Sequence, residues 1–166
     1  MGPALYGGPV TQANLDLLDR FYAAFARHDG GAMAACYTDD ATFADPVFTD
    51  LTGKEPGAMW RMLTARSNDL TVELVDRAAA GDSGSAHWIA HYTFGQTGRP
   101  VVNDVRSSFR FRDGLIAEQR DDFDLYRWTR QALGPVGAAL GWSPIVQGGV
   151  RRKARAGLDQ FLAREG

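Results

Sequence analysis

The chain of 166 residues has a single cysteine, Cys36, so an internal disulfide is excluded. This scarcity fits a reducing compartment, and we expect the protein to be cytoplasmic. Cys36 lies in the small apolar stretch AMAAC, which favours a buried packing residue over a nucleophile. No apolar run approaches the ~18 residues that a membrane-spanning helix needs. The first ten residues also lack the basic start and apolar segment of a secretion signal.

Net charge is also small, at −2, so the chain has no overall attraction to nucleic acid. The charge is uneven, because residues 126–166 carry seven Lys/Arg against two acids, and residues 1–125 carry eleven against eighteen. The basic run RRKAR at 151–155 is interpreted as the solvated face of an amphipathic helix that also neutralises the acidic body. We therefore expect neither a nucleic-acid partner nor a membrane partner.

Apolar residues recur at helical spacing in the first third of the chain. They predict a helix over 11–28 with Thr11 as its N-cap, a short helix over 32–37 and a third over 56–66. Asp39 and Asp40 are interpreted as a turn at a helix end, and residues 41–47 as a short extended segment.

The period then changes, and four strands are expected at 70–79, 85–95, 100–112 and 115–124. Each connection is typical of a hairpin, above all Asp113-Gly114. Antiparallel strands that follow helices predict an α+β fold. Helices are expected again at 126–133 and 150–164, the last with Val150, Ala154, Leu158 and Phe161/Leu162 on one side.

This layout predicts one folded domain with additions at both ends. We expect a flexible N-terminus over 1–10, an α+β domain over 11–128 and a helical extension over 129–166. The extension would pack on the same domain, with Trp142 and Ile145 over a pocket mouth, or against a partner in a dimer.

Strand alternation predicts which side chains face a pocket. The inward faces would be mostly aromatic, with few polar groups, as is typical of a small-molecule site. His87 and His91 fall on the opposite face of their strand, so we expect no metal site. The predicted wall consists of Asp45, Trp88, Tyr92, Asn103, Ser107, Gln119, Asp121, Phe123 and Tyr22.

Two motifs carry a family resemblance, DDATFADPV at 39–47 and QRDDFDL at 119–125. With the order of elements, they resemble the nuclear transport factor 2-like superfamily, closest to its SnoaL-like, ketosteroid isomerase-like and limonene epoxide hydrolase-like group. The resemblance implies a cone-shaped α+β barrel, with N-terminal helices packed in the concave face of a bent antiparallel sheet around an apolar pocket. It also implies a homodimer.

The resemblance further implies site residues. Asp45 falls on the general base of ketosteroid isomerase, and Asp121 falls on the last-strand aspartate of the epoxide hydrolase. The two oxyanion donors of the isomerase fall on Phe21, with Tyr22 one residue away, and on Ser107. The arginine–aspartate pair of the hydrolase falls near Trp88 and Ala90, which cannot replace it.

A carboxyl in an apolar wall should have a raised pKa, which suits acid/base work near neutrality. The sequence therefore predicts proton transfer on an apolar substrate by Asp45 and Asp121, without a cofactor, as an isomerase, cyclase or hydrolase. The alternative is a non-catalytic protein of the same fold that binds a hydrophobic ligand or plays a structural part. In that case Asp45 would cap its own turn, and Asp121 would pair with Arg120 or Arg106.

Overall fold

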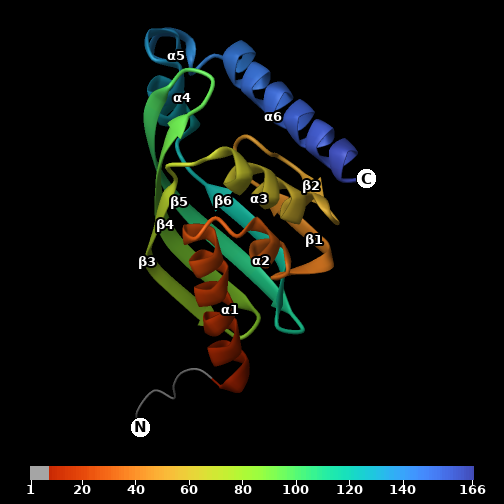
Figure 1. Cartoon of the computed structure of the whole chain (residues 1–166). Helices are drawn as coiled ribbons and strands as arrows, with labels where there is room; N and C mark the ends of the chain where they lie inside the picture. Colours follow the sequence, from red (N-terminus) through yellow and green to blue (C-terminus); the bar gives the residue numbers. More distant parts are fainter. Residues whose placement is uncertain (1–7) are drawn as a thin grey trace.

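A computed structural model describes residues 8–166, and residues 1–7 of the predicted flexible N-terminus lie outside that range. Figure 1 shows helices α1–α3 against one side of a curved sheet, α4 and α5 at one end of the sheet, and α6 running back beside α3. The helices are α1 (Pro9–Ala26), α2 (Gly30–Ala34), α3 (Glu55–Arg66), α4 (Leu125–Leu133), α5 (Pro135–Leu140) and α6 (Pro144–Glu165). The strands are β1 (Tyr37–Ala44), β2 (Leu51–Thr52), β3 (Thr71–Ala80), β4 (Ser83–Phe94), β5 (Arg99–Arg112) and β6 (Leu115–Asp122).

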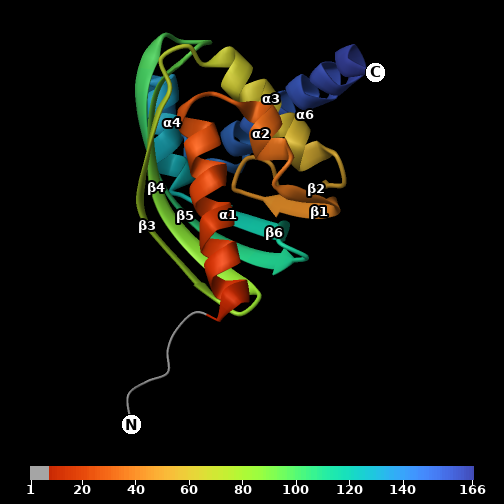
Figure 2. The same ribbon diagram turned by 60° about the horizontal axis from the view of Figure 1, so that its bottom comes forward.

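The six strands form one sheet in the order β2-β1-β6-β5-β4-β3. Strands β3 to β6 form the predicted antiparallel meander. Strand β1 joins it parallel to β6 and pairs with the two-residue strand β2 on its other side. The bend of the sheet around α1 is visible in Figure 2. The expected α+β fold with a bent, mainly antiparallel sheet is confirmed.

Helix α1 buries one face against the concave side of the sheet. Leu17, Leu18 and Phe21 are at most 1% exposed, and apolar burial of this kind is the main stabilising term of a fold. The predicted N-cap was wrong: Gly8 caps α1, with Pro9 in its first turn. The Thr11 hydroxyl instead accepts a hydrogen bond from the Gly81 N–H at 3.3 Å.

Other boundaries differ for local reasons. Helix α2 begins before residue 32 because the Asp29 carboxylate accepts from the Ala32 N–H at 2.9 Å. Asp39 and Asp40 lie in β1 rather than in a helix-end turn, and Asp40 pairs with Arg112. Helix α6 begins six residues before the predicted start because the Ser143 hydroxyl caps it.

The C-terminal extension packs on the same domain. Leu158 of α6 is fully buried, and Ala154, Phe161 and Leu162 pack against the main core, as the amphipathic pattern predicted. Trp142 and Ile145 are 64% and 83% exposed, so the expectation that they cover a pocket mouth was wrong. Across residues 8–166, no helix combines the length and the apolar character that crossing a membrane requires.

Candidate active site

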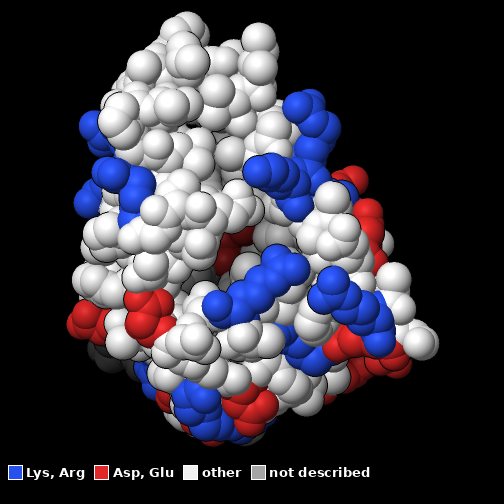
Figure 3. Space-filling model, turned by 45° about the horizontal axis from the view of Figure 1, so that its top comes forward, with Lys and Arg blue, Asp and Glu red and all other residues white. Residues whose placement is uncertain are grey.

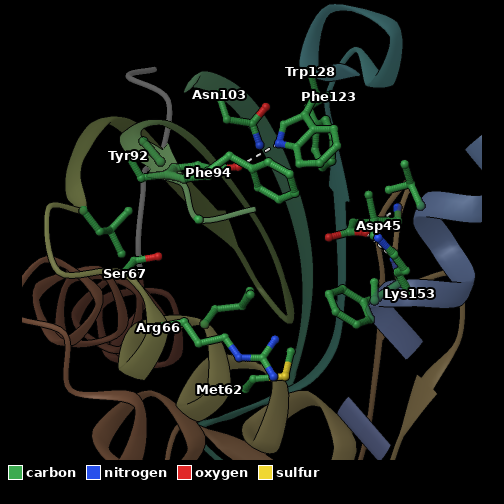
Figure 4. A pocket seen from close by; sticks show the side chains of 18 of the residues that line it. Asp45, Met62, Arg66, Ser67, Tyr92, Phe94, Asn103, Phe123, Trp128 and Lys153 are labelled. Carbon is green, nitrogen blue, oxygen red and sulfur yellow. Dashed lines mark hydrogen bonds between the residues drawn. The ribbon is translucent and has the colours of Figure 1, made fainter. Parts of the chain in front are cut away.

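A cavity of about 970 Å³ lies between the concave face of the sheet and helices α3, α4 and α6. Its volume is at the upper end of ordinary ligand sites. Four of the predicted substrate contacts line it, namely Trp88, Tyr92, Asn103 and Phe123. Figure 4 shows Asp45 and several of these side chains around one open space.

Asp45 and Asp121 are the acidic residues among those that line this cavity. Asp121 lies in β6 and Asp45 directly follows β1, whose parallel pairing with β6 ends with Ala44 beside Arg120. The two carboxyls line the same cavity, and the charge of Asp45 acts on Asp121.

Asp45 is half-buried and uses its two oxygens differently. Oδ1 accepts hydrogen bonds from the backbone N–H groups of Val47 and Phe48, at 2.7 and 2.6 Å. The turn that the alternative interpretation assigned to Asp45 is therefore present, but it occupies only one of the two carboxyl oxygens. Figure 4 shows the carboxyl of Asp45 reaching into the cavity. Burial raises the pKa of Asp45 to about 6, against the two N–H groups, which lower it.

Asp121 is only 5% exposed, and its Oδ1 accepts from Nε2 of Gln119 at 2.9 Å. Burial raises the pKa of Asp121 to about 7, and the negative charge of Asp45 adds to the rise. Ser107 and Gln119 oppose it by stabilising the ionised form. Among the described residues, Asp121 is in no ion pair, so the predicted pairing with Arg120 or Arg106 is not the arrangement found.

A chain of hydrogen bonds supports Asp121 from behind. The Trp60 indole N–H donates to the Tyr37 hydroxyl at 2.7 Å, Tyr37 donates to Oε1 of Gln119, and Gln119 donates to Asp121. An indole nitrogen only donates, so the direction of the whole chain is fixed and it ends on the carboxylate. The position and orientation of Asp121 are thus set by side chains that lie behind the cavity wall.

The remaining predicted contacts also lie behind the wall. Phe21 packs edge-on against Tyr37 and Trp60 in the core. The Tyr22 hydroxyl and the Trp88 indole both donate to Ser107, at 3.3 and 2.8 Å. Four residues are absent from the lining and instead buttress it, namely Phe21, Tyr22, Ser107 and Gln119.

Tyr92 has a hydroxyl proton that no described acceptor takes. The Trp128 indole N–H donates to the Tyr92 oxygen at 2.7 Å, drawn as a dashed line in Figure 4. Because Trp128 cannot accept, the Tyr92 O–H must point to another partner. Tyr92 lines the cavity, and the charge of Asp45 contributes to its raised pKa after burial. A ligand carbonyl in the cavity would thus have an available donor in Tyr92.

Sequence reasoning missed the lining that comes from helices. Met62, Leu63 and Arg66 of α3, and Trp128 of α4, face the cavity. Helix α6 supplies a further group, which consists of Val146, Gly149, Val150, Arg152, Lys153 and Ala154. The amphipathic pattern of 150–164 indicated a buried side, but it did not indicate that this side would line the cavity.

No metal centre is found within residues 8–166, where no three His, Cys, Asp or Glu side chains gather. His87 lies on the outer face of β4 with its Nε2 2.7 Å from an Asp104 oxygen, as the strand alternation predicted.

Residues 18–119 match the model of the SnoaL-like domain family. Because this match covers more than half of the chain, the protein belongs to that family, within the nuclear transport factor 2-like fold. The match ends just before Asp121 and leaves α4–α6 outside it.

Solved structures agree with this fold. An LEH-like epoxide hydrolase of M. tuberculosis has a TM-score of 0.64 and 22% identity, covering 81% of this chain and 100% of that chain. A protein described as a SnoaL-like polyketide cyclase, from Jannaschia sp. CCS1, has a TM-score of 0.70 and 16% identity, covering 80% of this chain and 99% of that chain. A protein of ketosteroid isomerase-like fold from Catenulispora acidiphila has a TM-score of 0.64 and 20% identity, covering 78% of this chain and 98% of that chain. Comparison with curated proteins gives no match.

Proposed function

We propose that the protein is an acid/base enzyme that moves protons within an apolar, carbonyl-containing small molecule, of the isomerase or cyclase type. One observation carries the proposal. Two carboxyls with raised pKa values, about 6 for Asp45 after β1 and about 7 for Asp121 in β6, face one apolar cavity. Paired acids whose pKa values are separated by their surroundings are the usual sign of an acid and a base in one site.

The surroundings of the two carboxyls assign the roles. Asp45 is the base, because two backbone N–H groups donate to its Oδ1 and stabilise the ionised form. Asp121 is the acid, because it is more deeply buried and the charge of Asp45 helps it retain its proton. The free oxygen of Asp45 takes a proton from the carbon next to a carbonyl, so the C–H bond breaks and an enolate forms. The unpaired O–H of Tyr92 and the protonated Asp121 stabilise its oxygen. Asp45 then returns the proton to another carbon. Alternatively, the enolate carbon attacks a second carbonyl, whose C=O π bond breaks, and the new alkoxide oxygen takes the proton that Asp45 holds.

An apolar wall favours this chemistry over water addition. The positions where the arginine–aspartate pair of the epoxide hydrolase relative falls are Trp88 and Ala90, which are 5% and 3% exposed. A water nucleophile would need polar side chains there to hold it. The structural likeness to a hydrolase and to a cyclase is therefore interpreted as a shared fold, and the site chemistry favours proton transfer within the substrate.

A binding role without catalysis is the second candidate, and the geometry of Asp45 is the observation in its favour. Its Oδ1 already stabilises the turn at residues 45–48. A protein that only holds an apolar ligand would keep that turn and would have no need of the second oxygen. The homodimer implied by the family resemblance also stays a prediction, which sedimentation velocity would test.

The replacement Asp45→Asn separates the two functions. Asn retains a side-chain oxygen that accepts from Val47 and Phe48, so the turn survives while the base is lost. We expect the variant to lose about 10³-fold in turnover of cyclic β,γ-unsaturated ketones, followed by ultraviolet absorbance of the conjugated product. Isotope exchange from D₂O into the same ketones would report enolate formation directly.

The matched control is Asp50→Asn, which removes an exposed acid five residues away and should leave turnover unchanged. The rate should peak between about pH 6 and pH 7, because Asp45 is protonated below this window and Asp121 ionises above it. Equal turnover by wild type and Asp45→Asn would refute the assignment. Ligand binding without any exchange by the wild type would favour the second candidate.

A further inference from the structure

Three basic side chains line the cavity close to its opening. Arg66 ends α3, and Arg152 and Lys153 lie in the middle of α6. Figure 3 looks onto this face, where basic side chains border a hollow and acidic atoms are visible inside it. In Figure 4, Arg66 and Lys153 approach the open space from two different helices. The mouth is therefore positive, and the acids of the cavity lie deeper.

These three cations differ from their neighbours on the same helices. Arg61 of α3 pairs with Glu165 at 2.7 Å, and Arg155 of α6 pairs with Glu55. No carboxylate within residues 8–166 pairs with Arg66, Arg152 or Lys153. The nearest acceptor of Lys153 is the neutral amide of Gln96, at 3.4 Å. In the described part of the chain, ion pairs thus form where α3 and α6 pack together and are absent where they border the cavity.

The guanidinium group of Arg66 lies against a glycine of the facing helix. A Cβ at Gly157 would lie 3.3 Å from Nη1 of Arg66 and 3.6 Å from Nη2. The absence of a side chain at Gly157 therefore leaves room for the guanidinium group between α3 and α6. A guanidinium carries a fork of donors that matches a carboxylate.

Positive charges over a low-dielectric cavity concentrate the field at its opening and attract anions there. Behind them the wall is apolar, with Phe94, Trp128 and Val150. At the base, the ionised Asp45 repels a second negative charge. A ligand with an apolar body and one anionic end therefore fits in a single direction, body inward and anion at the mouth.

We propose that the natural ligand of this cavity is an amphipathic organic acid whose carboxylate is held at the mouth by Arg66, Arg152 and Lys153. The inference rests on the proposed function, because it names the class of substrate for the same cavity. It also fixes which end of the substrate meets Asp45. The carboxylate stays in the mouth, and the reacting carbonyl lies in the apolar body of the molecule.

Pyrenebutyrate and its methyl ester form a probe pair that differs in charge and shares the apolar body. Binding would be followed by quenching of tryptophan fluorescence, since Trp88 and Trp128 line the cavity. We expect the acid to bind the wild type about tenfold more tightly than the ester at low ionic strength. High salt should reduce this difference in affinity between the acid and the ester, because salt screens interactions between exposed charges.

The triple variant R66Q/R152Q/K153Q should abolish the preference for the acid and leave the affinity for the ester unchanged. The control R164Q removes an exposed cation of α6 that does not line the cavity, and it should retain the full preference. Equal affinity of the wild type for acid and ester would overturn the proposal, as would a triple variant that keeps the preference. Loss of both affinities in the triple variant would also overturn it, because the three side chains would then be structural.

Two further measurements distinguish carboxylate binding at the mouth from catalysis and from attraction to a lipid surface. The variant Asp45→Asn should keep the preference for the acid even if no ketone is ever turned over, so the binding inference can stand while the proposed reaction fails. Vesicles of phosphatidylglycerol should not co-sediment with the protein. Co-sedimentation that the triple variant abolishes would reassign the three cations to an anionic lipid surface and overturn the proposal.

Discussion

The base and the mouth of the cavity are built by different parts of the chain and carry opposite charge. Strands β4, β5 and β6 form the base together with the segment that follows β1, and Asp45 and Asp121 lie there among aromatic side chains. The end of α3 and the middle of α6 form the mouth, with cations that no described carboxylate pairs. The SnoaL-like match covers most of the base and none of α6. If both proposals hold, the matched region supplies Asp45 and Arg66, residues after it supply Asp121, and α6 of the C-terminal extension adds the other two cations that bind the substrate carboxylate.

The largest expected effect is on the free energy of unfolding, when the ionisable carboxyl of Asp121 at the base is removed. The folded pKa of Asp121, about 7, lies above the ordinary value of 3.8 for an aspartate. The folded state therefore retains a proton that the unfolded chain releases, and stability falls as pH rises from about 4 to about 7. The variant Asp121→Asn removes this loss and should gain up to about 4 kcal/mol at pH ~8, and little at pH ~4.

Urea unfolding at several pH values would measure this gain. Asp122→Asn is the control, because Asp122 is exposed on the opposite face of β6 and should leave the pH dependence unchanged. The asparagine introduced in place of Asp121 would still have a side-chain oxygen that accepts the hydrogen bond from Nε2 of Gln119, as the carboxylate does in the wild type. If Asp121→Asn were less stable than the wild type at pH ~8, the ionised Asp121 would not be destabilised by its apolar surroundings, and this prediction would be wrong.

The next comparison is between two tyrosines near α4. Tyr92 has an O–H free to meet a ligand, whereas the Tyr126 O–H donates to the Ala138 carbonyl at 2.8 Å. We expect Tyr92→Phe to lower kcat about 10²-fold, as loss of an oxyanion donor does, with little change in KM. Tyr126→Phe should leave kcat unchanged. Trp128→Phe keeps the Tyr92 hydroxyl but frees its rotation, so it should lower kcat by about tenfold. Equal kcat values for the two Tyr→Phe variants would remove Tyr92 from the mechanism.

The base of the cavity was predictable from the sequence because its signals are local. Alternation along a strand has a period of two residues, so it placed Trp88, Tyr92, Asn103 and Phe123 on the inner face. The proline after Asp45 marked an extended residue. Alternation gives the face of a side chain but not its depth. It therefore could not separate the lining from the layer behind it, where Ser107 and Gln119 lie.

The mouth was not predictable because it arises from contacts far apart in the chain. Arg66 lies beside Gly157, about ninety residues away, and nothing near either residue indicates the other. The run at 151–155 was interpreted as a solvated face, and Arg152, Lys153 and Arg155 are indeed exposed. The pattern did not show that Arg152 and Lys153 also border the cavity. Strand β2 has two residues and no periodicity to detect.

The smallest expected effects concern how the C-terminal extension is held in place, and substitutions at two glycines test this. Gly137 in α5 lies so close to α4 that a Cβ would be 1.9 Å from the Thr129 carbonyl oxygen. Gly137→Ala must therefore displace α5 from α4, and we expect a loss of about 2 kcal/mol in unfolding free energy. At Gly148 in α6 the nearest atom to a Cβ is Nη1 of Arg152, at 3.7 Å, which is an ordinary contact.

Gly148→Ala should gain about 1 kcal/mol, because alanine has the higher helix propensity and meets no clash. Thermal unfolding would measure both changes. If the extension sets the mouth, Gly137→Ala should also weaken pyrenebutyrate binding more than binding of its ester, since α6 follows α5 directly and carries Arg152 and Lys153. Gly148→Ala should leave both affinities unchanged. Equal weakening of acid and ester by Gly137→Ala would mean that α5 supports the whole cavity, and the separation of base from mouth would fail.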